Sequence, residues 1–179
     1  ILSKTAVNDL VLNRPAMPPY FGSLANTFSY GRFSLYVNIA YKLGYYFEKS
    51  SISYYALFNS GNGNSDFAKR WQQPGDEQRT SVPSMPTIDN NSYQRDQFYN
   101  NSSVLVQRAD NIRLQEVNLS YHPVFAKKKW LGLTDLEFYA YAKNLGILWR
   151  ANKSGIDPDY SSGFVPQSYS LSFGLKARL

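Results

Sequence analysis

The stretch FSLYVNIAYKLGYYF, residues Phe33–Phe47, decides the fold class. Every odd-numbered residue in it is apolar or aromatic, whereas the even-numbered residues are mostly polar or small. Successive side chains of a β-strand point to opposite faces, so this alternation predicts a strand with one apolar and one polar face. Tilted as in membrane barrels, a strand of this length crosses the hydrocarbon layer of a bilayer. The pattern favours a transmembrane barrel strand.

The end of the chain, Tyr169–Leu179, alternates in the same way, with Ser, Gly, Lys and Arg at the even positions. One such strand also fits a long soluble sandwich, but two favour an outer-membrane barrel. We predict five strands in total. Their expected bounds are Ser23–Tyr30, Phe33–Phe47, Val104–Tyr121, Thr134–Trp149 and Tyr169–Leu179.

The alternation changes phase twice, near Gln115–Glu116 and near Asn144–Gly146. A β-bulge adds one residue to one strand and restores the phase, so we predict a bulge at each point. Between the first two strands, Gly31 and Arg32 predict a type II′ hairpin turn in which glycine supplies the positive φ.

Residues 50–103 are rich in Asn, Ser, Gly, Gln and Pro and predict one long loop. Loops this long without regular structure are usually functional or disordered. Within it, Ser65–Trp71 predicts one helical turn with Ser65 as the N-cap. Because outer-membrane barrels have short periplasmic turns and long extracellular loops, residues 50–103 and 150–164 are expected outside and Leu179 in the periplasm.

The composition excludes several classes of chemistry. Among 179 residues there is no cysteine and one histidine, which excludes disulfides, thiolate nucleophiles, cysteine-based zinc sites and multi-histidine metal sites. Fifteen tyrosines suit membrane interfaces and sugar-stacking walls. The net charge is +6, but the cations are scattered apart from Lys127–Lys129 beside Trp130. We therefore expect no nucleic-acid partner.

Four short sequence motifs follow one another along the chain. They are Tyr20–Gly22 with Asn26–Leu35, then Arg70–Asp76, then Ile112–Tyr121, and last Lys143–Leu145 with Gly155–Asp159. Together they resemble the C-terminal end of SusC/RagA-type TonB-dependent outer-membrane transporters. Two positions depart from the family pattern: Ser23 replaces the second glycine of a Gly pair, and the chain ends in Leu179 rather than Phe.

The resemblance implies an all-β fold, a transmembrane antiparallel β-barrel of about 22 strands. Residues 1–179 would supply about its last five strands, separated from a plug domain and the earlier strands. It further implies an importer of glycans or peptides in the outer membrane of a Gram-negative, Bacteroidetes-like bacterium. Expected partners are the remaining N-terminal part, outer-membrane lipid, a SusD/RagB-like lipoprotein lid, and the TonB complex through the missing part. Neither a cofactor nor enzymatic activity is expected.

Two loop segments are candidate binding residues. Trp71, Gly75 and Asp76 either contact substrate or lid, or fold the loop on itself, and we favour the second. Asp157–Asp159 has the composition of a calcium loop, but calcium takes six to eight oxygens and Asp-Pro commonly opens turns. We therefore expect no metal site.

The strands carry further candidates. His122, next to Pro123, is expected to be a bystander at the membrane interface. Asp135 with Glu137, and Asp110 with Glu116, have the chemistry of a glycosidase pair. Charges on a lumen-facing wall are ordinary, however, so we assign no catalytic residue.

Tyr139 and Tyr141 point to the predicted lumen, where they stack on a ligand or pack on the plug; both alternatives stay open, and the substrate-binding residues are unknown. Two alternative folds also remain. One is a soluble carbohydrate-binding β-sandwich, in which a second sheet buries the odd-numbered face of Phe33–Phe47. The other is a small porin of about eight strands, with an extra strand at Ile52–Phe58. A barrel instead exposes that face as a contiguous apolar band.

Overall fold

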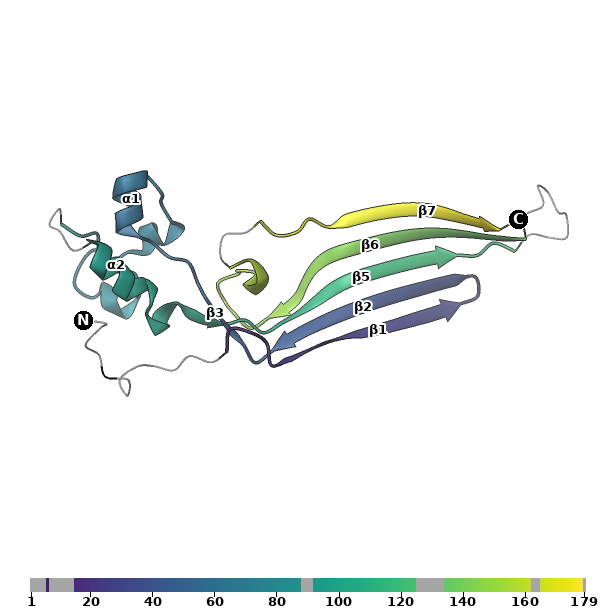
Figure 1. Ribbon diagram of the computed structural model, residues 1–179, viewed down its shortest axis with the longest axis horizontal. Coiled ribbons are helices and arrows are strands. Elements are labelled where there is room, and N and C mark those ends of the chain that lie inside the picture. The colour runs from purple at the N-terminus through teal and green to yellow at the C-terminus, as the bar shows by residue number, and fades with distance from the viewer. Residues whose placement is uncertain (1–5, 7–14, 88–91, 125–133, 162–164, 179) are drawn as a thin grey trace. The chain divides into compact units, whose positions relative to one another are not determined.

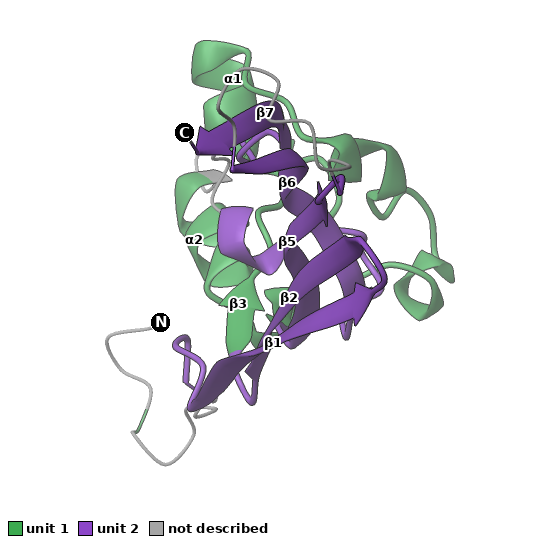
Figure 2. Ribbon diagram, turned by 90° about the vertical axis from the view of Figure 1, so that its right-hand side faces the viewer, with its two compact units in different colours: residues 1–14, 46–107, 161–163 green, residues 15–45, 108–160, 164–179 purple. Residues whose placement is uncertain are grey.

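The chain forms two compact units, which Figure 2 distinguishes by colour. The computed structural model describes residues 6, 15–87, 92–124, 134–161 and 165–178. The first unit, here the loop unit, comprises residues 1–14, 46–107 and 161–163, and the second, the sheet unit, comprises residues 15–45, 108–160 and 164–179. Within the described residues, no helix is long and apolar enough to cross a membrane.

The sheet unit is built on one antiparallel sheet with the strand order β1-β2-β5-β6-β7 (Figure 1). The strands are β1 (Tyr20–Tyr30), β2 (Phe33–Leu43), β5 (Asn111–Tyr121), β6 (Asp135–Arg150) and β7 (Ser170–Arg178). This confirms the prediction of an all-β fold made of antiparallel strands. Leu179 and the segment with Lys127–Lys129 and Trp130 lie outside the described residues.

The pairing register keeps each face of the sheet chemically uniform. Residues paired across neighbouring strands point to the same face. One apolar row crosses the five strands through Phe28, Leu35, Leu119, Ala140 and Phe173. The adjacent row on the opposite face runs through Thr27, Tyr36, Asn118, Tyr141 and Ser172. The predicted alternation is therefore in phase across the five strands at this level, whereas Phe21 and Ile147 pair with Lys42 and Arg113 and lie on the polar face.

Both predicted bulges are present. Leu114 and Glu116 of β5 pair with consecutive residues of β2, so Gln115 is the extra residue. In β6, the pairing with β5 shifts at the same level, where Asn144 and Gly146 have φ of 56° and 117°. The hairpin turn also agrees with the prediction, because Gly31 has φ of 59° and Arg32 is not among the described residues with positive φ.

The predicted strand Phe33–Phe47 is wrong beyond Leu43. Gly44 has φ of 82°, which ends the extended conformation of β2. Asp110 Oδ1 accepts hydrogen bonds from the backbone N–H of Gly44 at 2.7 Å and of Tyr45 at 3.4 Å. These N–H groups bond a distant side chain instead of a neighbouring strand.

The residues beyond this break pair separately. Tyr46–Glu48 forms β3, which pairs with β4 (Val106–Arg108) in a two-stranded sheet. The predicted strand Val104–Tyr121 is therefore also divided, because β4 and β5 are separate elements on either side of Asp110.

The predicted irregular loop at residues 50–103 is wrong, since this region folds on a core of its own. It contains α1 (Tyr54–Ser60), η3 (Ser65–Lys69), η4 (Asp76–Gln78), α2 (Ser92–Asn100) and η5 (Ser103–Leu105). The core consists of Ile52, Tyr54, Val82, Tyr99 and Leu105. The predicted helical turn is the 3₁₀-helix η3, but its N-cap is Asn64 rather than Ser65, because the Asn64 side chain accepts the N–H of Asp66 at 2.9 Å.

The extra strand proposed at Ile52–Phe58 is a helix instead. Ser53 caps α1, its Oγ accepting the N–H of Ala56 at 3.1 Å, and Gly61 ends the helix with φ of 68°. Both are ordinary helix-terminating residues. The small-porin alternative, which needs several strands beyond the five, therefore loses this candidate strand.

Asp66 is the polar centre of the loop unit. Its buried carboxylate accepts hydrogen bonds from Lys49 Nζ at 2.7 Å and Ser51 Oγ at 2.8 Å, and Lys69 lies 3.6 Å away. Burial alone would raise the pKa of the Asp66 carboxyl, but these hydrogen bonds and positive charges outweigh it and hold the pKa below 3.8.

The loop unit is expected to lose stability in acid. Since folding lowers the Asp66 pKa, its contribution is present above about pH 4, the range of an unperturbed Asp, and is lost as the pH falls through the folded value. Hydrogen exchange of the α1 amides measures this. Asp66→Asn should speed exchange at neutral pH and weaken its acid dependence, whereas Glu48→Gln, on an exposed side chain of β3, should leave both unchanged. Equal acid dependence in wild type and Asp66→Asn would contradict the assignment.

Candidate functional site

A cluster of charged residues lies on the polar face of the sheet, where β2 ends and β5 begins. Arg113 of β5 forms an ion pair with Asp157, and its Nε lies 3.2 Å from Asp159 Oδ2. The same Nε donates to Asn111 Oδ1 at 3.1 Å. The Arg113 side chain is only 13% exposed, so its charge is compensated almost entirely by protein groups.

Two more side chains, Lys42 and Tyr45, complete this cluster. Lys42 Nζ donates to both oxygens of Asp159 at 2.9 Å. Tyr45 donates its hydroxyl to Asp159 Oδ1 at 3.4 Å and accepts a hydrogen bond from Asn111 Nδ2 at 2.9 Å. Burial, followed by the neighbouring negative charge of Asp159, raises the pKa of Tyr45, which therefore stays protonated. The cluster thus balances two cations against two carboxylates.

The cluster holds the turn at residues 151–160, which includes the 3₁₀-helix η6 (Pro158–Tyr160), against the sheet. Asp157 also accepts the N–H of Asp159 at 3.0 Å, as expected for an Asp-Pro turn. Asp157 and Asp159, the two carboxylates that could have formed a calcium loop, therefore bind cationic side chains of the protein. Within the described residues, no group of three or more His, Cys, Asp or Glu side chains is placed to hold a metal ion.

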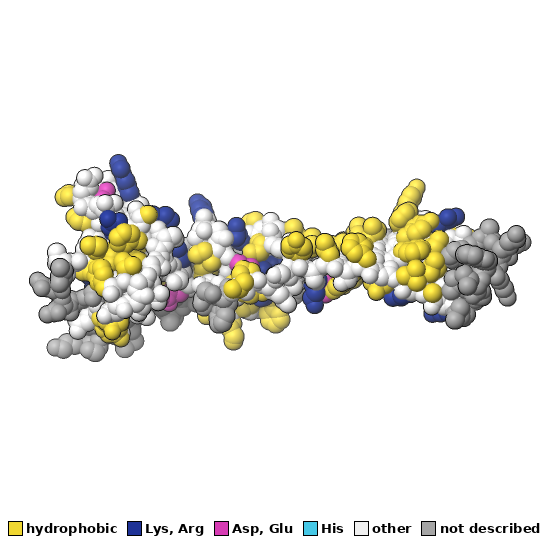
Figure 3. All heavy atoms as spheres, turned by 90° about the horizontal axis from the view of Figure 1, so that it is seen from above, with side chains coloured by type: hydrophobic (Ala, Val, Ile, Leu, Met, Phe, Trp, Pro, Cys, Tyr) yellow, Lys and Arg dark blue, Asp and Glu magenta, His cyan; other side chains and the backbone are white. Residues whose placement is uncertain are grey.

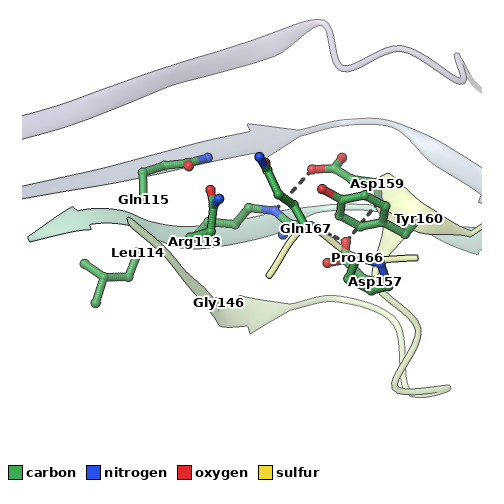
Figure 4. A pocket seen from close by; sticks show the side chains of 10 residues that line it. Arg113, Leu114, Gln115, Gly146, Asp157, Asp159, Tyr160, Pro166 and Gln167 are labelled. Atoms are coloured by element: carbon green, nitrogen blue, oxygen red, sulfur yellow. Dashed lines mark hydrogen bonds and ion pairs between the residues drawn. The ribbon is translucent and has the colours of Figure 1, made fainter. Parts of the chain in front are cut away.

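A pocket of 220 Å³ opens beside the cluster (Figure 4). Figure 4 shows Gln115 and Arg113 of β5 on one side and the turn with Asp157, Asp159 and Tyr160 on the other. The complete lining is Arg113, Leu114, Gln115, Asn144, Gly146, Asp157, Asp159, Tyr160, Pro166 and Gln167. The pocket therefore collects residues from both bulges and from the turn.

The structure separates Asp110 from Glu116, whereas Asp135 and Glu137 lie on the same face of β6, opposite Arg178 and Lys176 of β7. Asp110 is buried. It forms an ion pair with Arg108 and accepts a hydrogen bond from the backbone N–H of Gly44, just beyond the end of β2. Glu116 lies six residues further along the chain, about 20 Å away at strand spacing. Glu137 is paired with Lys176 at 3.1 Å. Each of these carboxylates thus has a place in the packing of the sheet.

His122, Tyr139 and Tyr141 lie on the same polar face. His122 Nε2 is 4.0 Å from Glu137, which links this histidine to an ion pair. The Tyr139 ring lies across Gly174, where a Cβ would clash with the ring and its hydroxyl. Tyr141 is paired with Asn118 of β5 and with Ser172 of β7. Whether either tyrosine contacts a ligand or a plug remains a prediction.

Trp71, Gly75 and Asp76 bind within their own loop. Trp71 Nε1 donates to Glu77 Oε2 at 3.0 Å, and Asp76 Oδ2 accepts the N–H groups of Gln72 and Gln73, each at 3.0 Å. Gly75 has φ of 100°, the conformation that a tight turn needs. This geometry is the one expected if these residues fold the loop on itself.

Comparison with solved structures finds the same arrangement of strands elsewhere. A chain of the RagAB peptide importer in the "closed-closed" state superposes with a TM-score of 0.59, 20% identity and 93% of this chain covered. A chain of the importer in the "open-open" state superposes with a TM-score of 0.53 and 21% identity over 80% of this chain. A chain of the RagAB peptide transporter superposes with a TM-score of 0.54 and 21% identity over 83% of this chain. The fold is RagAB-like.

The likeness covers a small part of those proteins. This chain spans only 15–18% of the length of the RagAB chains it matches. No family model matches the sequence, and a search of curated proteins finds no similar one. At this identity the comparison establishes the fold, and the activity has to be argued separately.

The central residues of the site were not predicted from the sequence. Lys42 and Arg113 looked like ordinary polar-face positions of strands, and Gln115 was noted only as a bulge residue. A usable signal was present, because Arg113 comes from the third of the four motifs, Asn144 and Asp157 come from the fourth, and all three meet at one pocket. Local sequence patterns do not reveal that these residues meet, because Arg113 and Asp157 are 44 residues apart in the chain.

Replacing Arg113 should release the turn. Arg113→Gln leaves Asp159 with Lys42 and Asp157 with no cationic partner among the described residues. Breaking such a pair costs up to roughly 3–5 kcal/mol when it is fully buried, and less at this partly exposed site. Hydrogen exchange in residues 151–160 should therefore accelerate. Arg32→Gln, an exposed arginine of the hairpin turn, is the matched control. Unchanged exchange in Arg113→Gln would show that the ion pairs do not hold the turn.

Proposed function

We propose that this chain forms part of the barrel wall and extracellular loops of a TonB-dependent importer of peptides or glycans in the outer membrane. The observation that carries the proposal is the exposed apolar face of the sheet, continuous over five strands. Figure 3 shows hydrophobic side chains gathered along the sheet. Soluble monomers rarely expose apolar patches of more than a few hundred Å².

The dimensions of this face fit a bilayer. From Phe33 to Leu43, ten residue steps at about 3.3 Å and a tilt near 40° rise about 25 Å, the height of the lipid-facing band of outer-membrane barrels. Aromatic residues lie at both ends, Tyr30, Phe33 and Tyr121 at the hairpin end and Tyr20, Tyr41 and Trp149 at the other. This matches the two aromatic girdles of such barrels.

The soluble-sandwich alternative predicts burial of this face. Several of its large side chains are instead 44% to 81% exposed in the described structure, namely Phe28, Leu119, Phe138, Leu171, Phe173 and Leu175. The opposite face carries the ion pairs of Arg113 and Glu137, which suits a water-filled lumen. The two faces together favour the barrel wall over the sandwich.

The edges of the sheet support further strands. In the described structure, β1 and β7 each pair on one side only. Each unpaired backbone group in hydrocarbon costs several kcal/mol, so a sheet in lipid has to close into a barrel. We propose about 22 strands, β7 pairing with the barrel's first strand. The likeness to RagAB chains over a small fraction of their length supports this arrangement.

The partners follow from the same proposal. The rest of the transporter would supply the other strands and a plug, and a TonB complex would act through that part. A RagB/SusD-like lipoprotein would cover the extracellular mouth, near the loops. The likeness to chains of the RagAB peptide importer supports a lid partner of this kind.

Spin labels test which face meets lipid. Labels at Leu35, Val37, Leu171 and Leu175 should be relaxed by lipid-soluble oxygen rather than by aqueous quenchers, because these residues share the apolar face. A label at Ser172, on the opposite face, should show the reverse accessibility. Quenching of the first four labels from water would rule out the barrel assignment.

A further inference from the structure

We propose that Asn62 is a site of spontaneous deamidation, a modification that converts its side-chain amide to a carboxylate and partly reroutes the main chain into isoaspartate. Asn62 and Gly63 form the single Asn-Gly sequence among the 179 residues, and they lie between α1 and η3. Both residues are exposed to solvent. The reaction needs only residues of the loop unit, so it would proceed whatever the chain transports.

The reaction begins with attack of the Gly63 main-chain nitrogen on Cγ of Asn62. Hydroxide takes the proton of this nitrogen, the new N–C bond closes a five-membered succinimide ring, and the side-chain nitrogen takes a proton from water and leaves as ammonia. Water then adds to one of the two ring carbonyls and breaks its bond to the ring nitrogen. Opening at one carbonyl gives aspartate, and opening at the other gives isoaspartate. No group is oxidised or reduced, and water is the co-reactant.

The two reacting groups are free to meet. Within the described part of the chain, the backbone N–H of Gly63 donates no hydrogen bond and the Asn62 side chain forms none. Gly63 carries no Cβ, so nothing on this residue hinders the approach of Asn62 Cγ to its nitrogen. A Cβ at this position would lie 3.9 Å from Leu57 Cδ1, so the surroundings are open as well.

The other asparagines that precede a small residue are held in place. Asn-Ser sequences occur at Asn59, Asn64 and Asn101, where the serine side chain already hinders the attack. A side chain bound by the protein cannot turn its Cγ freely toward the following nitrogen. The observed hydrogen bonds are Asn59 Nδ2 to the Tyr55 carbonyl at 2.9 Å, Asp66 N–H to Asn64 Oδ1 at 2.9 Å, and Asn101 Nδ2 to the Gln97 carbonyl at 2.7 Å.

Isoaspartate lengthens the connection from α1 to η3, because it adds one methylene to the main chain. The end of α1 is fixed by two hydrogen bonds, which the backbone N–H groups of Gly61 and Asn62 donate at 3.1 Å and 3.4 Å. The start of η3 is fixed by the side chain of Asn64, which accepts the N–H of Asp66. We expect this single cap to be lost first. Because η3 also positions Asp66, the polar centre of the loop unit, the modification should loosen that unit.

The experiment ages the purified full-length protein that contains this chain in mildly alkaline buffer. Mass spectrometry of its proteolytic peptides follows the mass gain that accompanies replacement of an amide by a carboxylic acid, and fragmentation of the peptides distinguishes isoaspartate from aspartate. The variants are Gly63→Ala and Asn62→Gln. Alanine fits the backbone at position 63, because Gly63 is not among the described glycines with positive φ. The peptides with Asn59, Asn64 and Asn101 serve as internal controls, which need no variant to fold.

Wild type should gain the mass at Asn62 well before the three control asparagines, at a rate that rises with hydroxide concentration. Gly63→Ala should slow this conversion severalfold, because the added Cβ hinders the attacking nitrogen. Asn62→Gln should show almost none, because its longer side chain would have to close a less favourable six-membered ring. Hydrogen exchange then separates charge from main-chain length. Residues 65–70 should exchange faster in aged wild type than in fresh Asn62→Asp, which carries the same charge without the extra methylene.

Three outcomes would overturn the inference. Conversion at Asn59, Asn64 or Asn101 as fast as at Asn62 would show that the structure does not single out this site. Equal rates in wild type and Gly63→Ala would exclude attack by the Gly63 nitrogen. Equal exchange of residues 65–70 in aged wild type and Asn62→Asp would show that the longer main chain leaves η3 in place. None of these outcomes bears on which face of the sheet meets lipid, which the spin labels test separately.

Discussion

Keeping one face of the sheet apolar across five strands is the constraint on which the rest of the structure depends. A shift of one residue in register moves every following side chain to the other face. β5 lies in the middle of the sheet and changes phase at Gln115, so without a correction its two halves would present opposite faces. The bulge at Gln115 and the irregular backbone at Asn144 together keep Leu114 and Val117 on the apolar side.

The same correction shapes the polar face. A residue that leaves the ladder frees its side chain, and Gln115 and Asn144 both line the pocket. The turn with Asp157 and Asp159 closes its other side and is held there by Arg113 and Lys42. The irregular backbone that keeps one face of the sheet apolar thus produces the hydrogen-bonding surface on the opposite face.

The loop unit is held together by a hydrophobic core instead of by strand pairing with two distinct faces. Its core forms around Ile52 and Tyr54, and the buried Asp66 ties Lys49 and Ser51 to it. Few of its apolar residues recur with a helical or strand period, because short helices and 3₁₀ turns each contribute one or two. A composition rich in Asn, Ser and Gly therefore conceals a folded unit.

The sequence by itself determined the features that depend on neighbouring residues: the strands, their two faces, the type II′ turn at Gly31 and the two bulges. These follow from the local geometry of an extended chain. Tertiary structure decided where β2 ends, because the side chain of Asp110 accepts a hydrogen bond from the backbone N–H of Gly44. These two residues are 66 positions apart in the chain. It also decided the pocket, since Arg113 meets Asp157 across 44 residues. Such contacts depend on which segments meet in space, which local side-chain alternation does not encode.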